Sequence, residues 1–360
     1  MKDILAEAGD LRGRLMAVFA NCIPDKMDFI EGMSLVSILS QIGIVDLRDE
    51  DIHIDLTIDD NTAISDTNDD AADDDDNDED KDDKMWSYEM DDDGRITKLE
   101  IFDENLAPFD LPAGIARLER LTDITVWNCK SLPVKELCNL RLHTLRLHRC
   151  SDLLNKFPIE MRLKFLKKLY IDSCRLHPSS TLLAWMVSQL PILEYLEFND
   201  MLEKEINRIV DVLCSNPNGA ACFQGSLTSL VISCCRLGDK QFEILMFEGM
   251  SCYPNVSSLN VMGNNIRSVQ SIMDRIKSND YDEETISKAI RHLHIVANPI
   301  MKNMKDDVNE VVAILTFLKT FNTIYNLGSI SITNCNDVED ASSNEWARMT
   351  SSFIKKLSVA

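Results

Sequence analysis

The sequence lacks most of the motifs that mark catalytic, membrane and secreted proteins. It contains no GxxxxGK phosphate loop, no HExxH, no GxSxG and no CxxC pair. Its start, MKDILAEAGDLRGRLMAVF, carries acidic residues and glycines where a secretory signal needs an unbroken apolar core, and the apolar run at 311–318 is too short to span a bilayer. We therefore expect a cytoplasmic or nuclear protein that is not an enzyme and uses no cofactor.

Basic residues are also scarce, with 37 Lys and Arg against 60 Asp and Glu and a formal net charge of −23. The acidity is concentrated, because residues 59–93 hold 18 acidic side chains and only two lysines, Lys81 and Lys84. This leaves −16 in that segment and −7 for the rest of the chain. A body of such mild charge argues against binding to a phosphate backbone, which requires clustered Lys and Arg, so we expect no nucleic acid as partner. The short apolar run at 311–318 likewise predicts no membrane partner.

One phrase recurs about nine times after Gly94, written as aliphatic-x-x-aliphatic-x-aliphatic-x-x-Asn/Cys. The copies begin at Ile96, Leu121, Leu142, Leu166, Leu193, Leu227, Val256, Ile290 and Leu327. The phrase resembles that of leucine-rich repeats over roughly residues 86–340. The resemblance implies an α/β solenoid with a parallel β-sheet on its concave face. The early copies resemble plant-type repeats, and the copy at Leu227 resembles the helical repeats of ribonuclease inhibitor.

The positions of the phrase predict which side chains are buried. Positions one, four and six are aliphatic and predict the core face, where each side chain contributes roughly 1.5–3 kcal/mol. Position nine holds a small group where the chain leaves the strand, at Cys129, Cys150, Cys174, Cys235, Asn264, Asn298 and Cys335. Five of the 11 cysteines therefore have a structural role, and we expect buried, reduced thiols. The copies start closer together in the early part, which predicts short outer connections there and helices later.

Composition and periodicity divide the chain into four segments. An N-terminal cap or docking element, an acidic insert, the repeat domain and a C-terminal capping helix occupy, in that order, residues 1–58, 59–85, 86–340 and 341–360. The first segment has helical spacing at 2–22 and 29–42 and strand alternation at 51–58. We expect the insert to be disordered, because like charges with almost no apolar surface cannot offset the entropy of ordering.

The candidate partner site lies on the concave face, at positions three, five, seven and eight of the phrase. The early copies place aromatic, Arg and His residues there, namely Phe102, Trp127, Arg146, His148, Arg149, Tyr170 and Tyr195. Aromatic and Arg clusters are typical of binding hot spots, so we expect another protein to bind here. The alternative is that these rings pack on one another across neighbouring strands and bind nothing.

Residues 89–100, EMDDDGRITKLE, allow two interpretations. They match an EF-hand calcium loop through Glu89, Asp91, Asp93 and Glu100, although this loop usually begins with Asp. They also fit the first strand of a repeat array, with a turn at Gly94, and we favour that interpretation.

The acidic insert gives a further alternative function. By a resemblance of parts to acidic leucine-rich nuclear phosphoproteins, it would bind histones or other basic proteins. The simpler interpretation is a solvated linker, since charge runs usually have that role.

Overall fold

The computed structural model describes most of the repeat region and one helix of the N-terminal segment. The described residues are Met27, 29–42, 86–102, 107–214, 221–278, 292–295, 297–300 and 329–331. The predicted helix at 2–22, the strand at 51–58, the acidic insert at 59–85 and the capping helix at 341–360 lie outside the described residues.

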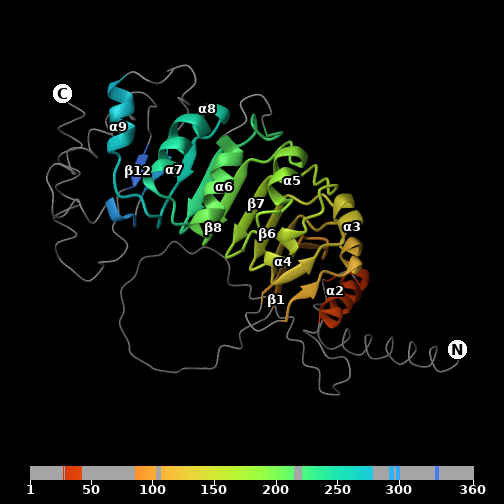
Figure 1. Ribbon diagram of the computed structural model, residues 1–360. Coiled ribbons are helices and arrows are strands. Elements are labelled where there is room, and N and C mark those ends of the chain that lie inside the picture. The colour runs from red at the N-terminus through yellow and green to blue at the C-terminus, as the bar shows by residue number, and fades with distance from the viewer. Residues whose placement is uncertain are drawn as a thin grey trace, which may run out of the picture.

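A curved sheet runs through the whole described repeat region (Figure 1). It follows the order β1-β2-β4-β6-β7-β8-β9-β10-β11-β12. The bounds are Trp86–Met90 for β1, Ile96–Ile101 for β2, Asp123–Trp127 for β4, Thr144–His148 for β6, Lys168–Asp172 for β7, Tyr195–Asn199 for β8, Ser229–Ser233 for β9, Ser258–Asn260 for β10, His292–His294 for β11 and Ser329–Ser331 for β12. β1 is antiparallel to β2 and all the later pairs are parallel. The parallel strands form the sheet that the leucine-rich repeat resemblance implies.

Each parallel strand corresponds to one copy of the repeat phrase. β2 begins at position one of its copy, and the eight others begin at position three. The described side chains at positions four and six are at most 3% exposed, and they belong to one continuous apolar cluster. Neighbouring strands and the outer connections together cover these side chains, so a repeat depends on its neighbours for stability.

The outer connections differ between the early and late repeats. Short elements follow the early strands: β3 (Phe109–Asp110), η1 (Ala113–Arg117), β5 (Cys129–Ser131), α3 (Val134–Asn139) and α4 (Ser151–Asn155). The later connections contain α5 (Leu182–Gln189), α6 (Glu203–Cys214), α7 (Asp239–Ile244), the π-helical turn η2 (Leu245–Gly249), α8 (Met250–Cys252) and α9 (Gln270–Lys277). The helices lie on the outer side of the sheet in Figure 1. The change from short elements to longer helices confirms the prediction from repeat spacing.

Position eight of the phrase has left-handed backbone in seven consecutive copies. The φ angle is 48–57° at Asn128, Arg149, Ser173, Asp200, Cys234 and Ala297, and 67° at Gly263. In this conformation the position-eight N–H reaches the position-seven carbonyl of the next repeat, for example from Arg149 to Asp172 at 3.0 Å. Side chains such as Arg and Cys disfavour this conformation, so the hydrogen bonds between repeats impose it.

Position nine forms a second set of bonds between repeats. In the early repeats the backbone N–H of Cys129 donates to Cys150 Sγ, and the N–H of Cys150 donates to Cys174 Sγ, each at 3.3 Å. The thiols donate in turn to carbonyl oxygens, as Cys150 does to His148 at 3.2 Å. Burial raises the pKa of Cys129 and of Cys174 to about 12, which keeps both thiols protonated. The prediction of buried cysteines with a structural role is confirmed for this ladder.

Asn replaces Cys at position nine of two later repeats. Asn264 Oδ1 accepts the N–H groups of Cys235 at 2.9 Å and Leu237 at 3.0 Å. Its Nδ2 donates to the carbonyls of Ile232 and Val261 at 2.6 and 2.8 Å. Asn298 repeats the arrangement one strand further along. Both amides are buried, so they satisfy backbone groups that water does not reach.

Helix α2 (Phe29–Gln41) packs on the first repeat. Leu35, Val36, Ile38 and Leu39 are fully buried and extend the core cluster of the solenoid. The carboxylate of Glu31, also buried, accepts the backbone N–H of Ile96 at the start of β2 and lies 3.5 Å from an Arg95 nitrogen. The predicted helix at 29–42 is therefore confirmed.

Residues 86–101 form a β-hairpin, which decides between the two interpretations of 89–100. Asp91 Oδ1 accepts the N–H groups of Asp93 and Arg95, and Gly94 has φ 72°. The carboxylates of Glu89 and Glu100 both pair with Lys98, at 2.6 and 3.4 Å. The strand prediction is confirmed, and the helix–loop–helix of an EF-hand is wrong for this segment. No group of three or more metal-ligating side chains occurs among the described residues.

Candidate functional site

The candidate site occupies the concave face of four neighbouring strands, β4, β6, β7 and β8. The parallel register brings Trp127 opposite His148 and Arg146 opposite Tyr170. These residues occupy positions five and seven of their copies, on the face opposite the buried positions four and six. The strand register therefore gathers side chains that lie about one repeat apart in the sequence.

Trp127 and His148 form the first contact group. Their rings are stacked, with centroids 3.7 Å apart and an interplanar angle of 29°. The guanidinium carbon of Arg149 lies 5.6 Å from the centre of the Trp127 ring. A cation over an indole ring is attracted by the negative ring face, so Arg149 adds to the stack.

Arg146, Tyr170 and Tyr195 form the second contact group. The guanidinium carbon of Arg146 lies 3.7 Å from the centre of the Tyr170 ring, and the Tyr170 and Tyr195 rings are 4.9 Å apart. The Tyr195 hydroxyl donates to Glu197 at 2.5 Å. Burial raises the pKa of Tyr170 and of Tyr195, and the Glu197 carboxylate raises the latter further. Both phenols therefore remain protonated donors.

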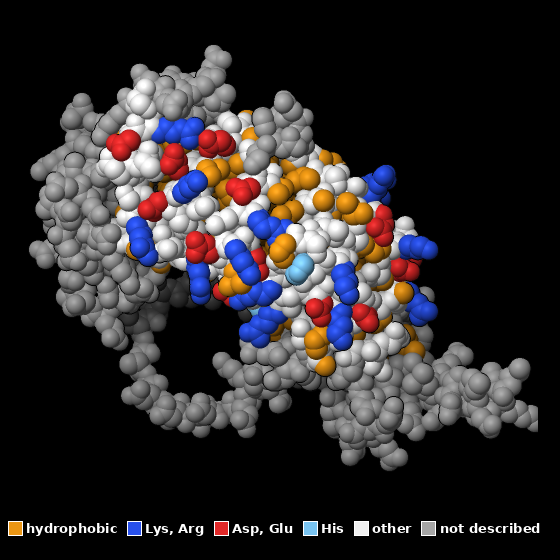
Figure 2. All heavy atoms as spheres, in the orientation of Figure 1, with side chains coloured by type: hydrophobic (Ala, Val, Ile, Leu, Met, Phe, Trp, Pro, Cys, Tyr) orange, Lys and Arg blue, Asp and Glu red, His pale blue; other side chains and the backbone are white. Residues whose placement is uncertain are grey.

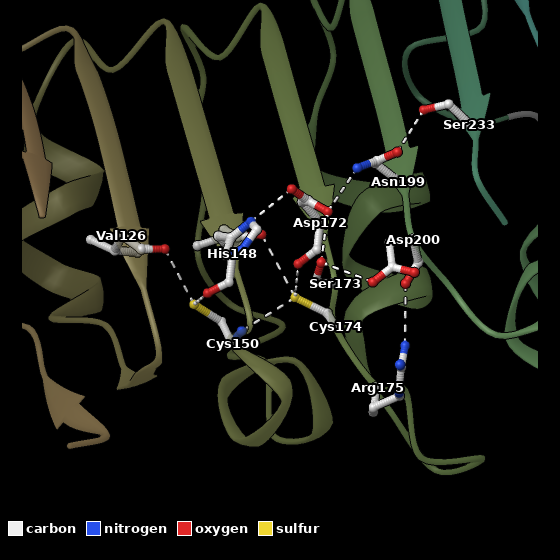
Figure 3. Close-up of polar contacts among 11 residues, drawn as sticks. Val126, His148, Cys150, Asp172, Ser173, Cys174, Arg175, Asn199, Asp200 and Ser233 are labelled. Atoms are coloured by element: carbon white, nitrogen blue, oxygen red, sulfur yellow. Dashed lines mark hydrogen bonds and ion pairs between the residues drawn. The ribbon is translucent and has the colours of Figure 1, made fainter. Parts of the chain in front are cut away.

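A polar row at position seven links the first contact group to the next repeats (Figure 3). His148 Nδ1 lies 2.7 Å from Asp172 Oδ2, and Asn199 Nδ2 donates to Asp172 Oδ1 at 2.9 Å. Ser233 then donates to Asn199 Oδ1 at 2.9 Å. The row holds the His148 ring in place against Trp127.

The pKa of Asp172 follows from this environment. Burial alone would raise it, but the hydrogen bonds from His148, Asn199 and Ser173 outweigh burial, so the pKa of this carboxyl lies below its ordinary value. Asp172 is therefore ionised at neutral pH. Ser173 Oγ donates a hydrogen bond to the Asp172 carboxylate and makes none to the His148 imidazole. A serine nucleophile would instead be hydrogen-bonded to the imidazole that acts as its base.

The structure brings together six of the seven predicted site residues. Phe102 is half-buried at the end of β2 and makes no ring contact with the other six within the described part of the chain. Asp172, Glu197, Asn199 and Ser233 were not predicted, although they bond directly to predicted residues or to one another. Polar residues at position seven of successive copies were the signal that could have revealed three of them.

The later repeats present a different concave face. Their described face positions include Ser229, Ser258, Asn260, His292 and His294, with no Trp, Tyr, Arg or Lys among these five. No ring stacking or cation–π pair is present among them. The described part of the concave face is therefore asymmetric along the solenoid, as the sequence predicts.

The surface seen in Figure 2 carries Lys and Arg interspersed with Asp and Glu over its described part. Over the described part of the chain, the large exposed apolar side chains are Ile159, Phe165, Ile192 and Val212. Among the described helices, none has the length and apolar character needed to cross a bilayer.

Comparison with known proteins yields a structural similarity only. No known protein family and no curated protein sequence matches the chain. Among solved structures, an internalin from Listeria monocytogenes matches 66% of this chain and 74% of its own, at 16% sequence identity and a TM-score of 0.28. The leucine-rich-repeat-like fold of this protein rests on its own repeat phrase, parallel strand order and inter-repeat hydrogen bonds.

Proposed function

We propose that this protein is a non-enzymatic interaction scaffold or receptor that binds another protein with the early part of its concave face. The observation that carries the proposal is the run of ring and guanidinium contacts across β4, β6, β7 and β8. Tryptophan, tyrosine and arginine supply most of the binding energy in protein interfaces. Their concentration on one part of the face supports that part as the partner site.

The mutual packing of these rings is compatible with binding. Trp127, His148, Tyr170 and Tyr195 are only partly buried, and Arg146 and Arg149 are exposed, so much of their surface still meets solvent. Packing fixes their rotamers before a partner arrives, which lowers the entropy cost of association. The interpretation in which the rings pack and bind nothing predicts the same contacts, so a binding experiment is needed.

The test is partner recovery with a triple variant, Trp127→Ala, Arg146→Ala and Tyr170→Ala. We expect the main partner to be lost from affinity purification while the thermal unfolding midpoint changes little, since these side chains lie outside the core. The matched control is Ser229→Ala, Ser258→Ala and His292→Ala, on the later part of the same face, which should retain the partner. If both triple variants recover equal amounts of the main partner, the proposal is wrong.

A second candidate function rests on the acidic segment. Residues 59–93 carry a net charge of −16, which supports binding of histones or other basic proteins. Deletion of residues 66–83 should then abolish histone binding at physiological salt, while the triple variant on the concave face should not. If the deletion leaves histone binding unchanged, the segment is a linker.

Location and repeat type complete the proposal. We infer a cytoplasmic or nuclear protein, supported by the nine described cysteines, which are all free and belong in a reducing compartment. We also infer about nine repeats, plant-type early and ribonuclease-inhibitor-like later, supported by the short early connections and the 12-residue helix α6.

A further inference from the structure

The charges on the early concave face point to the chemistry of the partner. We propose that this surface recognises an extended acidic segment of another protein, with Arg146 and Lys168 as the residues that contact its carboxylates. The inference rests on the proposed function and adds the class of partner. It follows from a difference between the charged side chains of this face: the acidic ones are hydrogen-bonded within the protein, and two of the basic ones have no carboxylate partner among the described residues.

The acidic residues of the face are hydrogen-bonded within the protein. Asp172 accepts from His148, Asn199 and Ser173. Glu197 accepts from Tyr195, and Asp123 accepts from the Thr122 hydroxyl at 2.6 Å. These carboxylates have hydroxyl, amide or imidazole partners on the protein itself, so they do not require a basic partner molecule.

The cations of the face are engaged differently. Arg146 and Lys168 are exposed, and neither forms an ion pair within the described part of the chain. Other cations of the fold are neutralised, as Lys98 is by Glu89 and Glu100, and Lys167 is by Glu194 at 3.0 Å. Two neighbouring strands therefore present positive charge without a carboxylate partner there.

Arg146 is also oriented for carboxylate recognition. The Tyr170 ring lies 3.7 Å from its guanidinium carbon, which covers one face of the planar group. The N–H groups at the edge of a guanidinium match the two oxygens of a carboxylate. Lys168 lies on the strand that carries Tyr170 and two positions before it, on the same face of the sheet.

The surrounding rings favour an extended segment that also carries apolar side chains. The Trp127–His148 pair lies two positions further along β4 and β6 than the row that contains Arg146, and Tyr195 lies beside Lys168 on the neighbouring strand β8. Alternate side chains of an extended peptide point the same way, so acidic residues can meet the cations while apolar residues contact the rings.

The experiment measures peptide binding to the full chain by fluorescence anisotropy. The probe is a labelled peptide of about twelve residues, alternating Glu and Leu with one Trp, and its match has Gln in place of each Glu. We expect the acidic peptide to bind about tenfold more tightly than the Gln peptide, with a preference that weakens at high salt. No preference for the acidic peptide would overturn the inference.

Two double variants with equal change in net charge locate the binding. Arg146→Gln with Lys168→Gln should abolish the preference for the acidic peptide. Lys204→Gln with Lys240→Gln, exposed on α6 and α7, should leave it within about twofold of the native value. If the two double variants weaken binding equally, the attraction is general and the inference is wrong.

The outcome is separable from that of the proposed function. Loss of the native partner in the Trp127, Arg146 and Tyr170 triple variant, without acidic-peptide binding, would retain the partner site and reject its acidic chemistry. If the native protein binds the acidic peptide but the triple variant still recovers the native partner, the preference for acidic segments stands and the proposed partner site is rejected. Binding that occurs only after deletion of residues 66–83 would overturn the assignment to a separate partner, in favour of the acidic segment of the chain itself.

Discussion

The early repeats and two of the later repeats bind buried backbone N–H groups of the preceding repeat with different side chains. At position nine, the early repeats use cysteine, where one sulfur accepts a backbone N–H at 3.3 Å. Two later repeats, those that begin at Val256 and Ile290, use asparagine, and the amide oxygen of Asn264 accepts two N–H groups at 2.9 and 3.0 Å. The backbone path is nevertheless the same, with left-handed residues at position eight in both halves.

This comparison separates what the fold requires from what it leaves free. In the described repeats, the fold buries the side chain at position nine and apolar side chains at positions four and six. It does not constrain the concave positions, and there the two halves differ most, with aromatic rings and cations in the early repeats and Ser, Asn and His in the later ones. This difference supports the proposal that the early face binds a partner, while the two ladders stabilise the fold.

The largest expected effect is at the asparagine ladder. Asn264→Ala removes a hydrogen-bond partner from four buried backbone groups, two N–H donors and two carbonyls, of which the Val261 carbonyl keeps the amide of Asn298. We expect the free energy of unfolding to fall by roughly 3–5 kcal/mol, the range for a broken buried network. Denaturant unfolding measures this, and a loss below about 1 kcal/mol would mean that water replaces the amide.

A smaller effect is expected at the cysteine ladder. Cys150→Ala removes the sulfur that accepts the Cys129 N–H and the thiol that donates weakly to the His148 carbonyl, so the loss should be about 1–2 kcal/mol. Cys234→Ala, at an exposed thiol in the same solenoid, serves as the control and should be nearly neutral. If Cys150→Ala costs as much as Asn264→Ala, the two ladders are not different in strength.

The polar row gives a pH-dependent prediction. Because the pKa of Asp172 is below its ordinary value, its ionised form stabilises the fold above the ordinary carboxyl range, and this contribution is lost as pH falls through the depressed pKa. Asp172→Asn should therefore cost about 1 kcal/mol at neutral pH and progressively less in acid. Unfolding curves of both proteins across acidic pH measure the difference. A difference that grows on acidification would contradict the assignment.

The smallest effect is expected at position eight. Cys234 has φ 54°, a conformation that glycine adopts without strain, so Cys234→Gly should stabilise the protein by about 0.5 kcal/mol. At position eight of the next repeat, Gly263→Ala replaces a glycine with a residue that has a side chain. The added methyl carbon lies 2.8 Å from Cys234 Sγ, so this variant should be less stable than the native protein. Thermal unfolding of both variants tests the pair, and shifts of the same sign would argue against backbone strain.

Much of the fold follows from the sequence because the repeat phrase encodes it directly. The strand positions, the buried cysteines and the turn at Gly94 each depend on a local pattern. The contact of His148 with Asp172 does not, since it joins residues 24 apart through side-chain rotamers and strand register. The left-handed backbone at Arg149 could not be predicted from the sequence either. The hydrogen bond from its N–H to the next repeat overrides the preference of an arginine for negative φ.

The asymmetry of the concave face is tested most directly by photo-crosslinking. A photoreactive phenylalanine replaces Tyr170 in one protein and Ser258 in another, so that the early and late faces carry the same probe. If the early face binds the partner, the Tyr170 position should crosslink to a defined protein in cells and the Ser258 position should not. Equal crosslinking at both positions, or crosslinking at Ser258 alone, would contradict the account.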